Sequence, residues 1–134
     1  MIVVSNTTTQ TIQPGQAITF DTVVLHSGCA EYHRGGSSSV ALKRSGVYEV
    51  HFTGNIGAAT AAGQVRLAVQ MDGDTLPETT MISTPAAVNT YANVSAATIV
   101  RNCNSGNNRI TVVNTGTTAL SLAPNSGLFL KRVA

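Results

Sequence analysis

The chain has 134 residues, which is enough for one domain with a substantial core and too few for two. Charged residues make up 10% of it and the formal net charge is +2, so the composition lacks the concentrated positive charge of a nucleic-acid-binding protein. Its Lys and Arg residues are scattered along the sequence, with only Lys43-Arg44 and Lys131-Arg132 adjacent. The hydrophobic content of 43% excludes an intrinsically disordered chain. We therefore predict a single domain over residues 1–134 and no nucleic-acid partner.

The first four residues, Met-Ile-Val-Val, are apolar but have no basic lead, and polar residues follow them at once. A secretory signal peptide has a different pattern. No apolar run in the sequence approaches the length of a membrane-spanning helix. We therefore expect no signal peptide in this chain and no membrane insertion.

Turn-forming residues divide the chain into short segments in which apolar and polar side chains alternate, a pattern typical of β-strands. In the clearest of them, the apolar residues Tyr48, Val50 and Phe52 alternate with the polar residues Glu49 and His51. After a short apolar opening at 2–4, strands are predicted in chain order at residues 17–25, 40–42, 47–56, 64–71, 76–82, 93–101, 109–114, 119–122 and 128–133.

The connections are marked by Gly, Pro, Asn and Ser. Asp72-Gly73 is a hairpin turn signal. Pro77 has no backbone N–H to donate, so the segment that contains it is predicted to be an edge strand or a loop. Longer connections are predicted at 26–39, 57–63, 84–88 and 102–108. No window combines helical periodicity with helix start and stop signals.

Eight to ten short strands separated by turns predict an all-β fold, a two-sheet antiparallel jelly-roll sandwich. Alternation within the strands identifies the side chains that should face the core. The residues that we expect to be buried between the sheets are Ile18, Phe20, Tyr48, Val50, Phe52, Val65, Leu67, Val69, Leu128 and Leu130, and Val23 and Leu25 are further candidates.

Four segments, taken together and in order, resemble the globular head of the C1q and tumour-necrosis-factor-like superfamily. Residues 18–21 (Ile-Thr-Phe-Asp) resemble its first core strand, and residues 46–52 (Gly-Val-Tyr-Glu-Val-His-Phe) resemble its Gly-x-Tyr-x-Phe strand. Residues 64–73 resemble its long strand ending in an Asn/Asp-Gly pair, and residues 126–130 (Ser-Gly-Leu-Phe-Leu) resemble its closing strand. With few aromatic residues and no Trp, the chain is closer to the bacterial and bacteriophage-encoded members.

This resemblance implies a jelly roll that packs as a compact homotrimer. It places Glu49 and His51 at the trimer interface, because the outer face of that strand meets neighbouring subunits in the superfamily. It also implies a non-enzymatic structural or adhesion module without a cofactor, a head that decorates a virion, a fibre tip or a spore or cell-surface filament. The expected location is a virion or extracellular surface, and the expected partners are the virion or filament and a host cell-surface glycan or protein.

Loops held by a rigid sandwich are where binding functions usually reside. The residues of the predicted connections that we expect to bind a ligand are His26, Tyr32, His33, Arg34 and Tyr91. A stand-alone carbohydrate-binding module is the alternative function, and it would use exposed aromatic rings such as Tyr32 and Tyr91 to stack on sugars. An enzyme is the third function class, in which Glu49 and His51 would act as acid and base, but the sequence contains no recognisable nucleophile motif.

Two clusters contain residue types that bind metal ions. His26, Cys29 and His33 could bind zinc together with Cys103, although their spacing is not that of a standard zinc site. The acidic residues around Asp72-Gly73-Asp74 could bind calcium together with Glu78. In both clusters we prefer ordinary loop and turn residues to a metal site. The two cysteines are predicted to be buried free thiols. The resemblance to the superfamily implies that they lie at opposite ends of the sandwich and are not bonded to each other.

Overall fold

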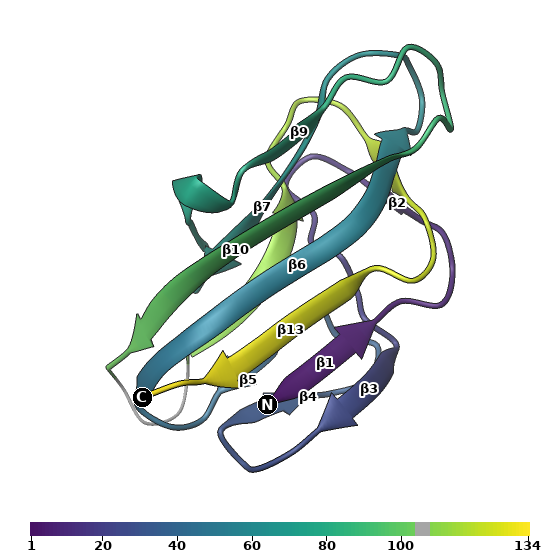
Figure 1. The fold of residues 1–134 in the computed structure, drawn as a ribbon. Helices are drawn as coiled ribbons and strands as arrows, with labels where there is room; N and C mark the ends of the chain where they lie inside the picture. Colours follow the sequence, from purple (N-terminus) through teal and green to yellow (C-terminus); the bar gives the residue numbers. More distant parts are fainter. Residues whose placement is uncertain (104–107) are drawn as a thin grey trace.

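The computed structural model describes residues 1–103 and 108–134; the centre of the predicted turn cluster, 104–107, lies outside the described residues. Within the described parts, thirteen strands form two antiparallel sheets that pack face to face (Figure 1). This arrangement confirms the all-β, two-sheet sandwich. The number of strands exceeds the expected eight to ten because several polar connections contain strands of two or three residues. No helix in these described ranges is long and apolar enough to cross a membrane.

The larger sheet has seven strands built around one long central strand. β10 pairs with β6 along its whole length, while the other edge of β6 is shared by β13 and β12. From β13 the sheet continues through β1 to the edge strand β3, and from β12 it continues to β2. The strands of this sheet are β1 (Ile2–Ser5), β2 (Gln10–Ile12), β3 (Thr22–His26), β6 (Gly46–Ala58), β10 (Ala92–Asn102), β12 (Leu120–Leu122) and β13 (Gly127–Arg132).

The smaller sheet has six strands in the order β4-β5-β11-β7, and β8 and β9 pair with successive parts of β7. A short 3-10 helix, η1 (Pro77–Thr79), lies between β8 and β9. The strands of this sheet are β4 (Glu31–His33), β5 (Val40–Leu42), β7 (Val65–Met71), β8 (Asp74–Thr75), β9 (Met81–Ser83) and β11 (Asn108–Asn114). Asp72 and Gly73, with φ of 54° and 86°, form the predicted turn after β7, since a type I′ hairpin requires positive φ at both positions.

The core lies between the two sheets, and alternation along the strands determines which side chains fill it. All ten side chains predicted for the core are buried. On β6, Tyr48, Val50 and Phe52 face the smaller sheet, whereas Glu49 and His51 point away from it. The alternating pattern of this strand therefore predicted the register of the central strand correctly.

The prediction of one continuous strand at 17–25 is wrong in part. Ile18 and Phe20 are buried as expected, but their N–H groups donate to Val112 O (2.8 Å) and Ser37 O (3.0 Å) in irregular backbone. The ladder begins only at Thr22, in β3. Because β3 is the outer edge of the larger sheet, Val23 and Leu25 are exposed and do not join the core.

Three other predicted boundaries also differ. The 26–39 connection contains β4, and β6 extends through Ala58 into the predicted 57–63 loop. In the segment 76–82, Pro77 begins η1, and only the last part forms a strand, β9. The hydroxyl of Thr79 explains the turn: it accepts the Val69 N–H (2.8 Å) and donates to Leu76 O (2.7 Å).

A buried asparagine fixes the connection between β1 and β2. Asn6 has no exposed surface, and its Nδ2 donates to Thr8 O (2.9 Å) and Ala123 O (3.2 Å). Its Oδ1 accepts the Ser126 N–H at 2.9 Å and also the Ser126 hydroxyl. The side chain thus satisfies polar groups of two distant turns in a place that water does not reach.

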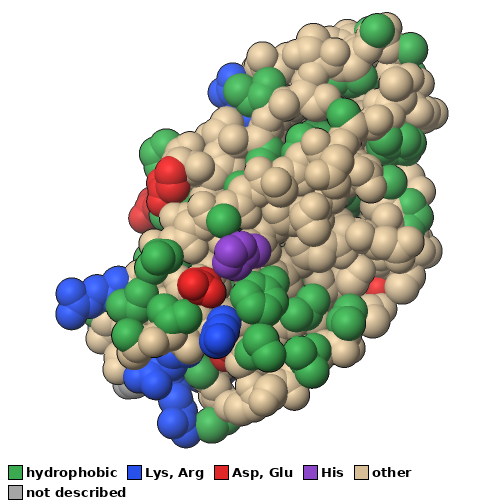
Figure 2. Space-filling model, viewed as in Figure 1, with side chains coloured by type: hydrophobic (Ala, Val, Ile, Leu, Met, Phe, Trp, Pro, Cys, Tyr) green, Lys and Arg blue, Asp and Glu red, His purple; other side chains and the backbone are tan. Residues whose placement is uncertain are grey.

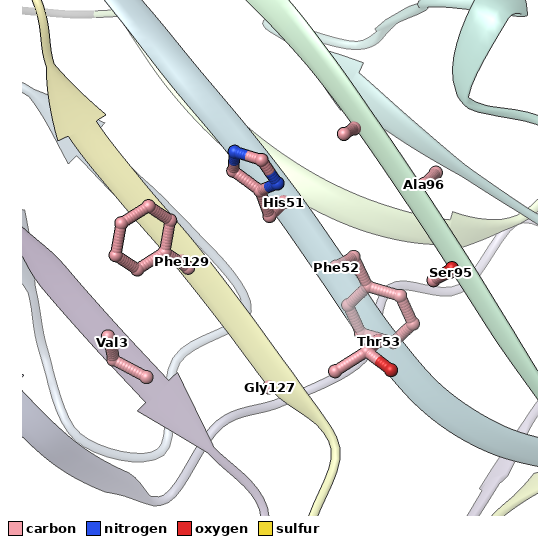
Figure 3. A pocket seen from close by; sticks show the side chains of 9 residues that line it. Val3, His51, Phe52, Thr53, Ser95, Ala96, Gly127 and Phe129 are labelled. Atoms are coloured by element: carbon pink, nitrogen blue, oxygen red, sulfur yellow. The ribbon is translucent and has the colours of Figure 1, made fainter.

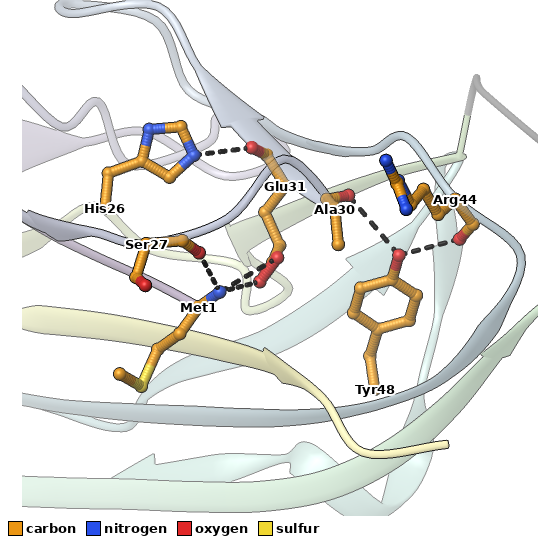
Figure 4. Close-up of polar contacts among 7 residues, drawn as sticks. All are labelled: Met1, His26, Ser27, Ala30, Glu31, Arg44 and Tyr48. Carbon is orange, nitrogen blue, oxygen red and sulfur yellow. Dashed lines mark hydrogen bonds and ion pairs between the residues drawn. The ribbon is translucent and has the colours of Figure 1, made fainter.

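A second polar cluster joins β4 to the start of β6 (Figure 4). The buried carboxylate of Glu31 lies 2.6 Å from the α-ammonium group of Met1, which also donates to Ser27 O at 2.7 Å. The Tyr48 hydroxyl donates to Arg44 O at 2.7 Å. Burial raises the pKa of the Tyr48 phenol, so this hydroxyl stays a neutral donor.

Replacing Phe52 by Ala should reduce the free energy of unfolding by about 3–5 kcal/mol, because it leaves a cavity between the sheets. Urea unfolding followed by circular dichroism measures the change. Ile82→Ala is the matched control: it shortens an apolar side chain that is half exposed on β9 and should cost less than about 1 kcal/mol. Equal costs for the two variants would contradict the assigned faces of β6.

Replacing Asn6 by Ala should reduce the free energy of unfolding by about 2–4 kcal/mol, because it leaves buried donors and acceptors of two turns without partners. Asn55→Ala removes an exposed asparagine of β6 and should cost less than about 1 kcal/mol. The same unfolding experiment compares them. If the Asn6 variant were as stable as the Asn55 variant, the buried cluster would not stabilise the fold.

Candidate functional site

The outer face of the larger sheet carries a row of side chains that crosses five strands. The pairing register places Ala97 of β10 beside His51 of β6, His51 beside Phe129 of β13, and Phe129 beside Val3 of β1. Val3 is in turn paired with Leu25 of β3. We call this row, together with Ile99, the outer-face stripe. Except for His51, its members are apolar.

Much of this stripe is accessible to solvent in the single chain. Ile99 is 64% exposed and Leu25 is 45% exposed, while Val3 and Phe129 are half buried by their neighbours. Figure 2 shows hydrophobic side chains gathered on this face around a histidine, over β13, β1 and the adjoining strands. Monomeric proteins seldom expose contiguous apolar surface of this kind unless it binds something.

The stripe is hollowed along β6. A shallow cavity of about 440 Å³ lies over the strands, with Val3, His51 and Phe129 along one part of it and Ser95 and Ala96 on β10 (Figure 3). The His51 and Phe129 rings meet edge to face, with centroids 5.4 Å apart and an interplanar angle of 69°. A second hollow continues from His51 towards Ile99. Such a surface can accept protruding apolar side chains.

Polar groups lie beside the stripe at one end. His51 Nε2 is 3.9 Å from Glu49 Oε2, and both side chains are partly exposed. Lys131 is paired opposite Glu49 on β13. Within the described residues, neither ring nitrogen of His51 has a hydrogen-bonded hydroxyl partner, so the pair lacks the contact that would activate a serine or threonine nucleophile.

The five residues expected to bind a ligand through loops do not form one surface. Tyr91 is 40% exposed and bonds Ser121 through its hydroxyl (2.8 Å), near the Ala58 end of β6. Tyr32 is 52% exposed on β4 and lies under Lys43, whose Nζ is 5.8 Å from the ring centroid. Tyr32 belongs to the smaller sheet, where it pairs with Ala41 of β5, whereas Tyr91 lies beside β12 and Gly57 of the larger sheet. They do not form a common sugar-stacking platform.

The two histidines of this set belong to strands. His26 ends β3, and its Nε2 lies 2.8 Å from Glu31 O. His33 lies in β4 and is buried, with ring nitrogens 2.8 Å from Phe20 O and 2.9 Å from Ser39 O. Both rings thus hold main-chain groups in place, whereas Arg34 is exposed in the turn after β4.

Several of the candidate metal ligands are engaged in other contacts. Cys29 Sγ accepts a hydrogen bond from Arg44 Nη2 (2.9 Å). Of the acidic groups, Asp72 accepts the Arg109 N–H (2.8 Å), and Glu78 accepts the Thr98 hydroxyl (2.9 Å). No group of three His, Cys, Asp or Glu side chains in the described part of the chain is placed to hold a metal ion.

The prediction about the thiols is wrong in two respects. Both cysteines are free, but they are exposed, not buried. They also lie at the same end of the sandwich, not at opposite ends: Cys29 contacts Arg44, and Cys103 lines a hollow together with Ser45. The physical reason is that the connection after β3 folds back along β5, which brings it to the turn that precedes β6.

Comparison with solved structures gives extensive matches across the chain. Murine APRIL at pH 5.0 superposes with a TM-score of 0.72 at 17% identity, covering 98% of both chains. Eiger TNF from S. frugiperda gives 0.78 at 14% identity, covering 99% of this chain and 91% of its own. The globular domain of zebrafish complement 1qA protein gives 0.68 at 13% identity, covering 98% of both. Neither a protein-family model nor a curated protein sequence matches.

The chain has the C1q/TNF jelly-roll fold. At these identities the similarity shows the fold alone. It does not support the expectation that the chain is closer to the bacterial and bacteriophage-encoded members. The fold also clarifies what sequence reasoning missed. Phe129 was not named for any surface, although the correctly predicted burial of Leu128 and Leu130 implies that the residue between them faces outward. The apolar residue Val3, paired with it, was the available second signal.

Both thiols should react with a chromogenic disulfide reagent in the native protein, because both are exposed. The titration should give two thiols per chain without denaturant, at a rate little changed by adding it. Thiols that react only after unfolding would show that the described placement of Cys29 and Cys103 is wrong.

Proposed function

We propose that this domain is a non-enzymatic binding module that works as a homotrimer, with the outer-face stripe and the adjoining Glu49 as the subunit interface. The observation that carries the proposal is the exposed apolar row across five strands, which lies outside the core that the two sheets bury between them. Covering apolar surface is the main driving force of stable association. The superfamily that the chain resembles packs as compact homotrimers through the same face.

The composition of the face supports a protein partner. The stripe is apolar at its centre, and the charged residues Glu49 and Lys131 lie at its margin, the arrangement found in protein–protein interfaces. Three-fold packing would bring the His51 rings towards one axis, where each could meet a copy of itself or Glu49 of a neighbour. These polar groups would then fix the register of subunits that apolar contacts hold together.

We place the trimer on a virion, a fibre tip or another extracellular filament, where it binds surface ligands through loops at the ends of the sandwich. A trimer presents each loop three times, which raises avidity for repeated surface groups without new contacts. The weakly charged surface and the absence of a catalytic arrangement around His51 in the described residues are consistent with this role.

Light scattering after gel filtration tests the assembly. The wild type should have a mass of about 41 kDa, three times the 13.8 kDa of the chain. Phe129→Glu should shift the protein towards the monomer mass, because it buries an unpaired charge in the interface. Ile82→Glu introduces the same change on an exposed residue of the other sheet and should leave the mass unchanged. A wild-type monomer at high protein concentration would refute the proposal.

A further inference from the structure

One end of the sandwich gathers basic side chains that are separated in the sequence. It is the end where β6 begins and where β10 and β13 finish, close to the C-terminus (Figures 1 and 2). Arg101 of β10 and Arg132 of β13 are paired with successive residues on the two edges of β6. The side chains that we call the basic end comprise five of the eight Lys and Arg residues of the chain: Lys43, Arg44, Arg101, Lys131 and Arg132.

This end is concave. A hollow of about 530 Å³ is lined by Arg101, Arg132, Asn102 and the Ser45-Gly46 turn. Arg132 Nε donates to Ser45 O at 2.9 Å, which fixes the guanidinium beside the turn. The terminal nitrogens of Arg132, and the guanidinium of exposed Arg101, have no hydrogen-bond acceptor among the described residues. Both residues line the hollow, and their remaining N–H donors are of the kind that binds an anion.

The scaffold under the basic end is held by buried polar contacts. Arg44 O accepts hydrogen bonds from the Tyr48 hydroxyl (2.7 Å) and from Asn102 Nδ2 (2.8 Å). Asn102 also donates to Leu42 O at 3.3 Å and is itself buried. The turn that carries Lys43 and Arg44 is thus positioned before any ligand arrives, which lowers the entropy cost of binding.

Acidic groups in the described residues compensate only part of this charge. Glu31 is nearby, but its carboxylate is fully buried and paired with the Met1 ammonium group. Glu49 lies opposite Lys131 on the outer face, and the carboxyl group of Ala134 lines the hollow. Two negative groups against five positive ones leave a local surplus far denser than the net charge of +2 suggests. The scattered positions in the sequence concealed this concentration.

The geometry favours one class of anion. Arg101 and Arg132 lie on strands either side of β6, so their backbones are two strand spacings, or roughly 10 Å, apart. Because they pair with Val47 and Tyr48, which face opposite ways, their side chains leave opposite faces of the sheet and come together only at its end, where both line the hollow. Guanidinium groups bind oxyanions such as sulfate through paired hydrogen bonds. The hollow has no aromatic lining in the described residues, so it lacks the stacking surface that single-stranded nucleic acids use. We propose that the basic end binds a sulfated polysaccharide, whose charges recur along an extended chain.

Heparin-affinity chromatography of the purified protein tests this proposal, with a sodium chloride gradient and isothermal titration with a heparin oligosaccharide. The wild type should be retained at 0.15 M salt, roughly physiological ionic strength. Arg101→Ser and Lys43→Ser should each elute at lower salt and reduce the slope of log affinity against log salt by about one. The Arg101 side chain has no hydrogen bond in the described structure, and that of Lys43 has only an exposed contact with the Tyr32 ring, so both variants should melt close to the wild-type temperature.

Arg34→Ser is the matched control, because it removes the same charge from the turn at the opposite end of the β4–β5 hairpin. It should elute with the wild type. A loss equal to that of Arg101→Ser would show that only net charge matters and would overturn the proposal. Lack of retention would overturn it too, as would equal binding to fully desulfated heparin or to duplex DNA. Each comparison is made at a matched oligomeric state, so the result does not depend on whether the chain forms a trimer.

Discussion

The alternation of side chains along β6 is the constraint on which the rest of the structure depends. Tyr48, Val50 and Phe52 fill the core on one side, while Glu49 and His51 face outward on the other. A shift of one residue in any ladder of this strand would exchange the two sets. Since β10, β13 and β12 all pair with β6, its register also determines which of their side chains reach the core and which reach the outer face.

The outer face follows from that register and accounts for the proposed assembly. His51 is paired with Ala97 on one neighbouring strand and with Phe129 on the other, and Phe129 is paired with Val3. Buried polar contacts, such as those of Asn6 with Ser126, keep the turns between these strands in place. The result is a rigid apolar face that needs little rearrangement to associate, a condition that favours affinity because few groups must be ordered on binding.

Local patterns were enough to predict the core and the fold class, and long-range pairing explains what they could not give. Tyr48 and Phe52 were predictable because their own strand alternates clearly. His33 was assigned to a binding loop, yet its ring is enclosed by Phe20 O and Ser39 O, which no local pattern encodes. Arg101 and Arg132 are far apart in the sequence and line one hollow only because their strands flank β6. Local patterns also could not predict that Cys29 and Cys103 lie at one end of the sandwich, because this follows from the return of the chain along β5.

A fold shared with APRIL, Eiger and complement 1qA at 13–17% identity does not by itself carry their functions to this chain. The central claim therefore rests on the outer-face stripe as the surface where copies of the chain meet. A crystal structure of the assembled protein tests it most directly. The account predicts three copies around one axis, with His51, Phe129 and Ala97 buried between them. An assembly that leaves His51 and Phe129 facing solvent would contradict it.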